Sequence, residues 1–289
     1  MDSLLVGIAT ALVSAFSWAM STILIRVGLH NKSPISANIF RLYVVSIIYA
    51  FVFAFSGSFT IIRSLPLSII LVAFASAQFG FVIGDYFYFS ALKRMGVSRT
   101  VPVTSTYPLW AILWAVIFLG RKVNPRVLVG AILVVMAIVI VKRAEDKENS
   151  DPMGFIFALM APLSWSVAIV SMDWLTGRID VLTLAGLRMM LAAIGVSVFL
   201  PRYGGELRKT SRMEALVLTG AAVFGLLIGQ YTFVYSVEMV GSQIAAPVSA
   251  INPIISSVFA VFLLREPPNR RIFEGLALAV LGVVLISTA

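Results

Sequence analysis

The feature that most constrains this chain is a series of long apolar runs separated by short connections. A helix crosses the apolar core of a bilayer, about 30 Å thick, with about 20 predominantly apolar residues. Ten runs of about this length follow one another, at residues 4–27, 35–55, 67–91, 101–119, 125–141, 153–175, 181–200, 213–236, 244–264 and 271–288. The runs are continuous, unlike the alternating strands of a membrane barrel. The sequence therefore predicts an all-α, multi-pass integral protein of the cell membrane.

The composition is that of a chain surrounded by lipid. It is 60% hydrophobic and 12% charged, whereas soluble domains average about 45–50% apolar and about 25% charged residues. The net charge of +9 is spread over the predicted loops without forming a patch, so we expect the lipid bilayer and no nucleic acid as a partner. Cysteine is absent, and we expect no metal and no cofactor. The first run is too long for a signal peptide and lacks its basic flank, so we expect it to be kept as a helix.

The chain carries the same pattern twice. When it is shifted by 145 residues, glycines, tyrosines and prolines of the first half fall on the same residue types in the second half. The matches include Gly80/Gly225, Gly84/Gly229, Tyr86/Tyr231, Gly96/Gly241, Pro102/Pro247 and Pro108/Pro253. With a shift of 147, Trp18 falls on Trp165 and Arg41 on Arg188. Matches of these residue types in a fixed order are far rarer by chance than apolar matches, so we infer a duplication.

Each copy holds five of the ten predicted spans. Because five is odd, the second copy enters the membrane from the opposite side, which predicts two inverted five-helix repeats. Many secondary transporters have this architecture, with the substrate site near the midplane where the repeats meet. The predicted boundaries are 1–141 for the first repeat, 142–152 for a charged linker and 153–289 for the second repeat.

Several motifs give the chain a family resemblance. They are Ser17-Trp18 and Ser164-Trp165, Arg41 and Arg188, and a tract from Asn252 onward that contains prolines, Glu266 and later glycines. With these motifs the chain resembles the ten-helix, EamA-type members of the drug/metabolite transporter superfamily over essentially its whole length. The first half departs from the pattern, because Arg121 stands where relatives usually have glutamate. The resemblance implies a central cavity formed by the first, third, fourth, sixth, eighth and ninth spans, with both termini in the cytoplasm.

Two prolines flank a polar insert in the fourth span and again in the ninth. A proline inside a helix removes a hydrogen bond and kinks the helix, and in hydrocarbon the freed carbonyl needs a partner. We predict that Pro108 and Pro253 kink these spans. The alternative, which is stronger for the outer prolines Pro102 and Pro247, is a place in the first turn of a helix. The inserts contribute the predicted cavity-lining residues Thr104, Tyr107, Ser249 and Asn252.

Gly80 and Gly84, and again Gly225 and Gly229, lie four residues apart and so share a helix face. Small residues at this spacing let two helix backbones approach closely. We predict that the third and eighth spans cross at these glycines. A dimerisation face or ordinary close packing stays open, so we expect a monomer or a homodimer.

Asp85 is the only carboxylate well inside a predicted span, and Gln78 lies seven residues earlier on the same face. Ionisable groups inside a membrane are costly and are functional candidates by default. We predict Arg41 as the partner of Asp85. Two readings stay open: a static charge pair, or a site where Asp85 couples transport to a proton or binds a substrate amine.

Arg188 repeats Arg41 in the second half but has Gln230 where Arg41 has an acid. Its candidate acidic partners, Asp173 and Glu238, lie at helix ends on its own side of the membrane. The two halves are therefore predicted to differ in charge.

Aromatic residues recur in the spans that are predicted to form the cavity. Tryptophan and tyrosine also collect in the interface belts of membranes, so each of them has two readings. Trp18 and Trp165 lie deeper than a belt would, which favours the cavity. The predicted lining aromatics are Trp18, Tyr86, Tyr107, Trp114, Trp165 and Tyr231.

The basic residues predict an orientation opposite to the one that the resemblance implies. Lysine and arginine are concentrated in the loops after odd-numbered spans. The positive-inside rule then places both termini outside.

The sequence favours a secondary transporter that moves a small organic metabolite, such as an amino acid, by alternating access. It has no Walker motif; export is implied by the resemblance, and a coupled ion or proton stays open. Phosphorylated or nucleotide sugars are the alternative, although they require more arginines and lysines in the cavity. The other classes are a channel or scaffold, and an intramembrane enzyme with paired carboxylates, a histidine cluster or an activated nucleophile. We predict no catalytic residue.

Overall fold

The computed structural model describes residues 3–28, 33–142, 151–263 and 270–289, which form helices. Most of the predicted linker (143–150) and Glu266 lie outside these described residues. The first half contains α1 (Ser3–Gly28), α2 (Pro34–Ser56), α3 (Ser58–Ser64), α4 (Leu67–Ala77), η1 (Gln78–Gly84), α5 (Asp85–Thr104), α6 (Tyr107–Leu119) and α7 (Pro125–Lys142). The second half contains α8 (Pro152–Leu175), α9 (Val181–Val196), η2 (Ser197–Phe199), α10 (Leu200–Arg208), α11 (Arg212–Ala222), η3 (Val223–Ile228), α12 (Gly229–Val240), α13 (Ser242–Ser249), α14 (Asn252–Leu263) and α15 (Arg270–Ser287).

Seven helical stretches of the described residues are long and apolar enough to cross a membrane. They are Ser3–Ile25, Pro34–Ser56, Leu67–Arg94, Pro152–Leu175, Val181–Arg208, Arg212–Val240 and Ser242–Leu263. Three further apolar helices are shorter, at Tyr107–Leu119, Pro125–Ile140 and Phe273–Ser287. Large apolar side chains such as Phe51, Phe55 and Phe118 are exposed on the outside of the fold. The chain is therefore a multi-pass integral membrane protein.

Polar side chains fix where several of these helices begin. Ser33 accepts a hydrogen bond from the Ser36 N–H before α2, and Asp180 accepts one from the Thr183 N–H before α9. Ser211 and Glu214 form a reciprocal capping box at the start of α11. Such caps accept hydrogen bonds from N–H groups that have no partner in the first turn of a helix. They therefore determine the residue at which each helix begins.

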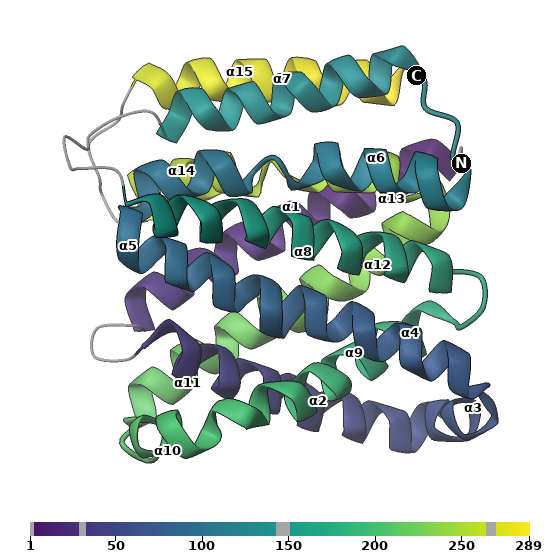
Figure 1. Cartoon of the computed structure of the whole chain (residues 1–289), viewed down its shortest axis with the longest axis vertical. Helices are drawn as coiled ribbons and strands as arrows, with labels where there is room; N and C mark the ends of the chain where they lie inside the picture. The colour runs from purple at the N-terminus through teal and green to yellow at the C-terminus, as the bar shows by residue number, and fades with distance from the viewer. Residues whose placement is uncertain (1–2, 29–32, 143–150, 264–269) are drawn as a thin grey trace.

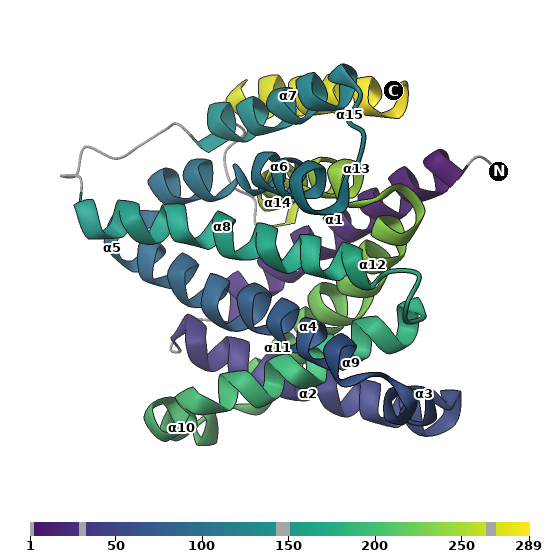
Figure 2. The same cartoon turned by 45° about the vertical axis from the view of Figure 1, so that its right-hand side comes forward.

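The strongest packing joins the two halves. The pairs α1 with α12, α5 with α8, α2 with α9 and α7 with α15 each combine a helix from before the linker with one from after it. Figures 1 and 2 show α7 and α15 side by side at one end of the molecule, away from the larger group of helices. The halves are thus interlocked, and the interior lies between helices of different copies.

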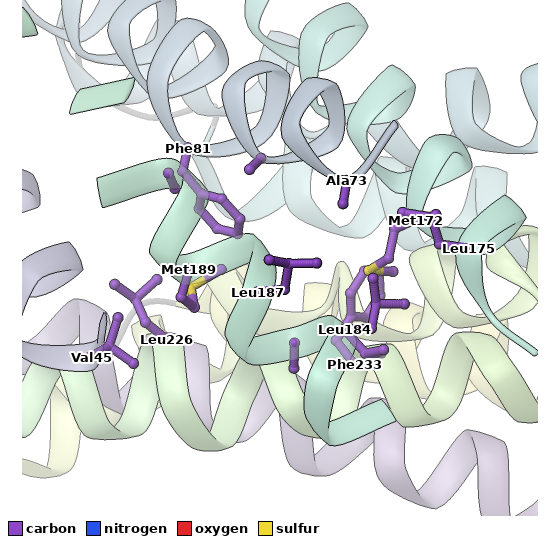
Figure 3. Close-up of a cluster of buried hydrophobic side chains, with 14 of the residues drawn as sticks. Val45, Ala73, Phe81, Met172, Leu175, Leu184, Leu187, Met189, Leu226 and Phe233 are labelled. Atoms are coloured by element: carbon purple, nitrogen blue, oxygen red, sulfur yellow. The ribbon is translucent and has the colours of Figure 1, made fainter. Parts of the chain in front are cut away.

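The largest apolar cluster lies beside the centre of this interior. Figure 3 shows Ala73 and Phe81 of the first half facing Met172, Leu187 and other apolar side chains of the second half. Alanines are frequent among the fully buried residues, as expected where membrane helices associate through small side chains. Phe81, Leu226 and Phe233 of this cluster also line the cavity described below, so the cluster forms an apolar part of its wall.

Two π-helical segments interrupt long spans at matching places. The segment η1 joins α4 to α5, and η3 joins α11 to α12. The predicted glycines Gly80 and Gly84 lie in η1, while Gly225 lies in η3 and Gly229 directly follows it. Such segments often mark functional sites because they redirect side chains within a helix. Neither was predicted from the sequence.

The predicted fourth and ninth spans are each broken beside an inner proline, and the outer prolines are not in the first turn of a helix. The helix ends before Ser105 and resumes at Tyr107, and a second break lies between Ser249 and Asn252. The inner prolines, Pro108 and Pro253, are in the first turn of the resumed helices, where a proline costs no hydrogen bond. The outer prolines, Pro102 and Pro247, lie inside α5 and α13. The breaks therefore lie directly before the inner prolines, and each helix ends at the residue whose carbonyl the proline cannot bond.

Two expected boundaries also differ. Residues 92–100 were expected to connect the third and fourth spans, but α5 continues through them to Thr104. The short helices α3 and α10 lie in the connections that follow the second and seventh predicted spans. No proline or glycine pair interrupts 92–100, which explains why the helix is able to continue.

Candidate functional site

A cavity of about 250 Å³ lies between the two halves of the chain. It is lined by Trp18, Asn38, Arg41, Gly80, Phe81, Asp85, Tyr107, Trp165, Ala168, Ile169, Arg188, Gly225, Leu226, Gln230, Phe233 and Asn252. The lining comes from α1, α2, η1, α5 and α6 on one side of the linker and from α8, α9, η3, α12 and α14 on the other. The duplicated helices therefore share one polar chamber.

The two tryptophans of the Ser-Trp motifs reach across to the other half. Trp165 Nε1 donates a hydrogen bond to Asp85 Oδ1 at 3.1 Å, and Trp18 Nε1 donates one to the Gly225 carbonyl at 3.0 Å. A Cβ added to Gly84 would lie 2.6 Å from Trp165 Nε1, and one added to Gly229 would lie 2.7 Å from Trp18 Nε1. The second glycine of each pair thus makes room for an indole ring of the opposite copy.

Asp85 is held by neutral donors. Asn38 Nδ2 donates to Asp85 Oδ2 at 3.2 Å and to the Phe81 carbonyl at 3.1 Å, and Trp165 donates to the other carboxylate oxygen. Asn38 was not among the predicted site residues. Its signal in the sequence is a lone amide in an apolar run, three residues before Arg41.

The expected contact between Arg41 and Asp85 is not formed. Arg41 Nη2 donates a long hydrogen bond of 3.4 Å to Ser21 Oγ, and the buried Arg41 Nε has no hydrogen-bond partner among the described residues. Both residues line the cavity. They share one chamber without forming an ion pair.

Arg188 also differs from its expected pairing. Its Nε donates to Ser76 Oγ at 3.0 Å, its Nη1 contacts Met172 Sδ at 2.9 Å, and its guanidinium lies 5.3 Å from the centre of the Phe81 ring. Arg188 is 3% exposed and lines the cavity. A cationic group is therefore held in the chamber by neutral partners.

Asp173, a candidate partner for Arg188, has other contacts. Its carboxylate accepts a hydrogen bond from Arg121 Nη2 at 2.6 Å and bonds from the Ser242 N–H and hydroxyl at 2.9 and 2.7 Å. The side chain of Asp173 is fully buried, whereas that of Arg121 is 41% exposed. This cluster connects the end of α8 to the start of α13 and to the loop after α6.

Six predicted lining residues lie outside the cavity wall. Gln78 donates to the Leu191 carbonyl at 2.9 Å, and Trp114 donates to Ser166 Oγ at 3.0 Å. Tyr86 and Tyr231 are 41% and 38% exposed on the outside. The hydroxyls of Thr104 and Ser249 bond to carbonyls within their own broken spans. These residues were predicted to line the cavity because they are polar or aromatic residues within apolar spans. In the structure their side chains do not line the cavity.

An ion pair at the edge of the fold starts α8. Arg94 Nη1 donates to Asp151 Oδ2 at 2.9 Å, while Asp151 Oδ1 accepts from the N–H groups of Met153 and Gly154. The hydrogen bond from Arg94 is the main cause that lowers the pKa of the Asp151 carboxyl, and the two backbone hydrogen bonds act in the same direction. The charged form of Asp151 therefore stabilises the start of the helix.

The chamber is suited to holding a small polar solute. Its described lining offers two guanidinium groups, one carboxylate, and the indole and phenol rings of Trp18, Trp165 and Tyr107. It also offers the side-chain amides of Gln230 and Asn252, in addition to the amide of Asn38 that is bonded to Asp85. Among the described residues, no group of three histidine, cysteine, aspartate or glutamate side chains is placed to hold a metal ion. The arrangement can bind and orient a solute through charge, hydrogen bonds and ring contacts.

Comparisons with known proteins agree with a transporter. An uncharacterized transporter of Archaeoglobus fulgidus is 29% identical over 279 residues, which cover 96% of this chain and 97% of that protein. A Bacillus anthracis protein named "Putative sugar uptake protein" is 25% identical, with 97% of this chain and 95% of that protein covered. A solved crystal structure shares the fold, with a TM-score of 0.77 at 16% identity and coverage of 96% of this chain and 95% of that chain.

The family follows from a match over both halves. The model of the EamA-like transporter family matches residues 5–143 and again residues 152–288. This assignment fits the drug/metabolite transporter superfamily and makes the chain a transporter by family. The chain belongs to the EamA-like transporter family.

Proposed function

We propose that the protein is a secondary transporter that moves small organic solutes such as amino acids by alternating access. In this proposal the ten apolar runs form two inverted five-helix repeats, with boundaries at 1–141 and 153–289 and a charged linker between them. The repeats rock against each other, so that the shared chamber opens first to one side of the membrane and then to the other. One copy of the chain suffices for this mechanism, whether it is a monomer or part of a homodimer.

The crosswise packing supports the inverted arrangement. Trp18 packs on Gly229 as Trp165 packs on Gly84, and each tryptophan donates a hydrogen bond to η3 or to the residue after η1 in the other copy. Contacts that are repeated between exchanged partners are expected where two copies are related by a two-fold axis. Such an axis lies in the membrane plane when the copies are inverted.

The observation that carries the proposal is the chamber between the copies. It combines amides and aromatic rings with a carboxylate and two arginines, and helices of both copies contribute these groups. Relative motion of the copies would therefore change every wall of the site at once. Such a lining suits a solute with both hydrogen-bonding groups and an apolar part.

Sugars are the second candidate, because relatives from Bacillus and Listeria carry the name of sugar uptake proteins. Amides and aromatic rings also suit a neutral sugar. Phosphorylated sugars fit less well, since two arginines and one opposing carboxylate leave little positive charge for a phosphate dianion. Export, which the resemblance implies, and uptake, which those names state, are the two directions to compare.

Reconstitution tests the proposal directly. Proteoliposomes are loaded with unlabelled alanine, leucine, phenylalanine, glucose or glucose phosphate, and entry of the labelled solute is followed with and without a pH gradient. We expect saturable counterflow of amino acids and none in protein-free liposomes. A lack of counterflow for every solute, or an ionic conductance instead, would contradict the transporter proposal.

Asp85 is the proposed coupling residue. A carboxyl that exchanges protons in the chamber would make transport depend on pH, and Asp85→Asn removes that carboxyl while keeping its size. We expect counterflow by the variant to lose its acceleration by a pH gradient. An unchanged response to the gradient would show that Asp85 is a static polar residue.

A further inference from the structure

Among the described residues that line the chamber, positive charges outnumber negative ones. Arg41 and Arg188 are the cationic residues of its lining, and Asp85 is the anionic one. Asp85 accepts hydrogen bonds from Asn38 and Trp165, and neither arginine is paired with it. Charges in a membrane interior are costly unless they are paired, so the excess of positive charge needs an explanation.

Neither guanidinium is satisfied by its protein partners. A guanidinium has five N–H donors, but Arg41 makes one long bond to Ser21 and has a buried Nε without a partner among the described residues. Arg188 uses Nε and Nη1 for contacts with Ser76 and Met172. Donor capacity is therefore left over at both residues.

The Nη2 groups of both arginines lie beside glycines of the cavity wall. Arg41 Nη2 is 2.9 Å from the place that a Cβ on Gly225 would take, and Arg188 Nη2 is 3.8 Å from the corresponding place at Gly80. Each glycine belongs to the other half and lines the cavity. A side chain at Gly225 would collide with the guanidinium, so the glycine keeps that part of the wall open.

The scaffold under the two arginines is built alike. Ser21 Oγ donates to the Ala221 carbonyl at 2.8 Å, and Ser76 Oγ donates to the Ala168 carbonyl at 2.6 Å. Both serine hydroxyls then accept from an arginine of the cavity. When the two halves are aligned, Ser21 corresponds to Ala168 and Ser76 to Ala221. Each of the two Ser–Ala contacts therefore has one serine, which α1 supplies in one contact and α4 supplies in the other.

We propose that Arg41 and Arg188 form a carboxylate-binding subsite and that the transported solute carries a carboxylate. The inference rests on the proposed function and names the group by which that site selects its substrate. The planar guanidinium fork pairs with a carboxylate through parallel hydrogen bonds. A carboxylate would accept hydrogen bonds from the free donors and would also offset the excess positive charge. A neutral sugar would accept the hydrogen bonds but would leave the charge uncompensated.

Two kinds of solute share this chemistry. A zwitterionic amino acid would place its ammonium group at Asp85 and its carboxylate at the arginines, and a simple monocarboxylate would use the arginines alone. Asp85 distinguishes them, because its carboxylate attracts an ammonium group and has no favourable charge interaction with an uncharged end.

The test uses ligands that differ by one group. Thermal unfolding of the purified full chain in detergent is measured against concentrations of leucine, leucinol and isocaproate, and of phenylalanine, phenylalaninol and hydrocinnamate. Glucose, chloride and inorganic phosphate are added as separate probes. A ligand that binds the folded state raises the midpoint in proportion to its affinity. We expect the amino acid or the amine-free acid of at least one set to bind at least tenfold more tightly than its amino alcohol.

The variants locate the effect. Arg41→Gln and Arg188→Gln should each weaken carboxylate binding about tenfold or more, which corresponds to about 1.4 kcal/mol. Arg41→Lys and Arg188→Lys keep the charge but not the fork, and they test the site even if a glutamine variant does not fold. Arg63→Gln is the matched control, because it removes an exposed guanidinium on α3 outside the chamber. Asp85→Asn should weaken leucine binding but not isocaproate binding if the solute is zwitterionic.

Three results would overturn the subsite: equal binding of the amino alcohols and the acids, a full effect of chloride alone, or no binding of any carboxylate. These results are distinct from a failure of the proposed function. Counterflow of solutes regardless of a carboxylate would leave a transporter without this subsite. Carboxylate binding that depends on both arginines, together with no counterflow of any solute, would support the subsite and contradict the transport mechanism.

Discussion

The two sides of the chamber have the same scaffold but different polar groups. On one side Trp165 packs on Gly84 and donates to Asp85, which also accepts from Asn38. On the other side Trp18 packs on Gly229, but the position that matches Asp85 is Gln230, and Trp18 donates to a backbone carbonyl. The position that matches Asn38 is the buried Ala185.

This difference separates the residues that allow close helix packing from the residues that supply polar groups to the chamber. Glycine and tryptophan recur because each allows or provides the close contact on which the crossing depends. The acid and its amide partner occur once, as expected if only one side binds a particular group of the solute. A duplicated fold thus yields a chamber with two unlike ends.

A second place shows the same divergence in the sequence. Arg121, which pairs with the buried Asp173, falls on Glu266 in the duplicated alignment, and Asp173 falls on Arg26. The two halves therefore carry opposite charges at corresponding positions. The side chains of Glu266 and Arg26 lie outside the described residues.

The largest expected effect tests whether the scaffold is equivalent on both sides. Gly84→Ala and Gly229→Ala should each destabilise the protein by about 1–3 kcal/mol, because the added methyl group would overlap an indole ring. Gly204→Ala in α10 is the control, since nothing lies within 4 Å of its added Cβ. Unfolding in detergent measures all three, and a cost at only one of the two crossings would break the equivalence.

Moving the charge sharpens the contrast between Asp85 and Gln230. Gln230→Glu adds a second carboxylate to the chamber and removes the excess of positive charge, so carboxylate binding should weaken about tenfold, or about 1.4 kcal/mol. Gln230→Asn, which adds no charge, is the control. Titration of leucine against thermal unfolding gives the affinity, and equal binding by the Glu and Asn variants would argue against an electrostatic role.

The glycines beside the two arginines should differ in tolerance. Gly225→Ala would bring a methyl group to 2.5 Å from Ser21 Oγ and 2.9 Å from Arg41 Nη2, whereas Gly80→Ala would make ordinary contacts, the nearest at 3.4 Å from Ala168. We expect Gly225→Ala to weaken carboxylate binding severalfold and to cost about 1 kcal/mol of stability. Gly80→Ala should change neither property measurably. Equal effects of the two substitutions would contradict the close approach of Arg41 and Ser21 to Gly225.

The smallest effect concerns the edge of the fold, where Arg94 of α5 pairs with Asp151 at the start of α8. Because the pKa of Asp151 is lowered in the folded protein, its stabilising contribution is present above the pKa of the unfolded chain and is lost as the pH falls through the folded pKa. Asp151→Asn keeps the cap but not the charge. It should lower the unfolding midpoint slightly at neutral pH, and the difference from wild type should vanish in acid.

The sequence predicted what depends on spacing and composition. Apolar runs defined the helices, and the repeated glycines marked close contacts between helices. The prediction that the third and eighth spans cross each other at these glycines was wrong, because Gly84 packs on Trp165 of α8 and Gly229 packs on Trp18 of α1. Asn38 was missed because its counterpart is alanine, so the duplication gave no hint of it. The π-helical segments were also missed, since they arise from packing between helices rather than from local preference. Tyr86 and Tyr231 match each other in sequence and both face outward, which shows that a repeated residue need not line the site.

The central claim is that the second five-helix copy is inverted, and cysteine labelling from each side of the membrane tests it most directly. The chain has no cysteine of its own, so Thr60→Cys and Lys209→Cys each introduce a single thiol at an exposed position, in matching connections of the two copies. Figure 1 shows the helices near them, α3 and α10, at opposite sides of the molecule. A membrane-impermeant maleimide should label the two variants from opposite faces of the membrane. Labelling of both from the same face would contradict the inverted repeat and, with it, the alternating-access mechanism.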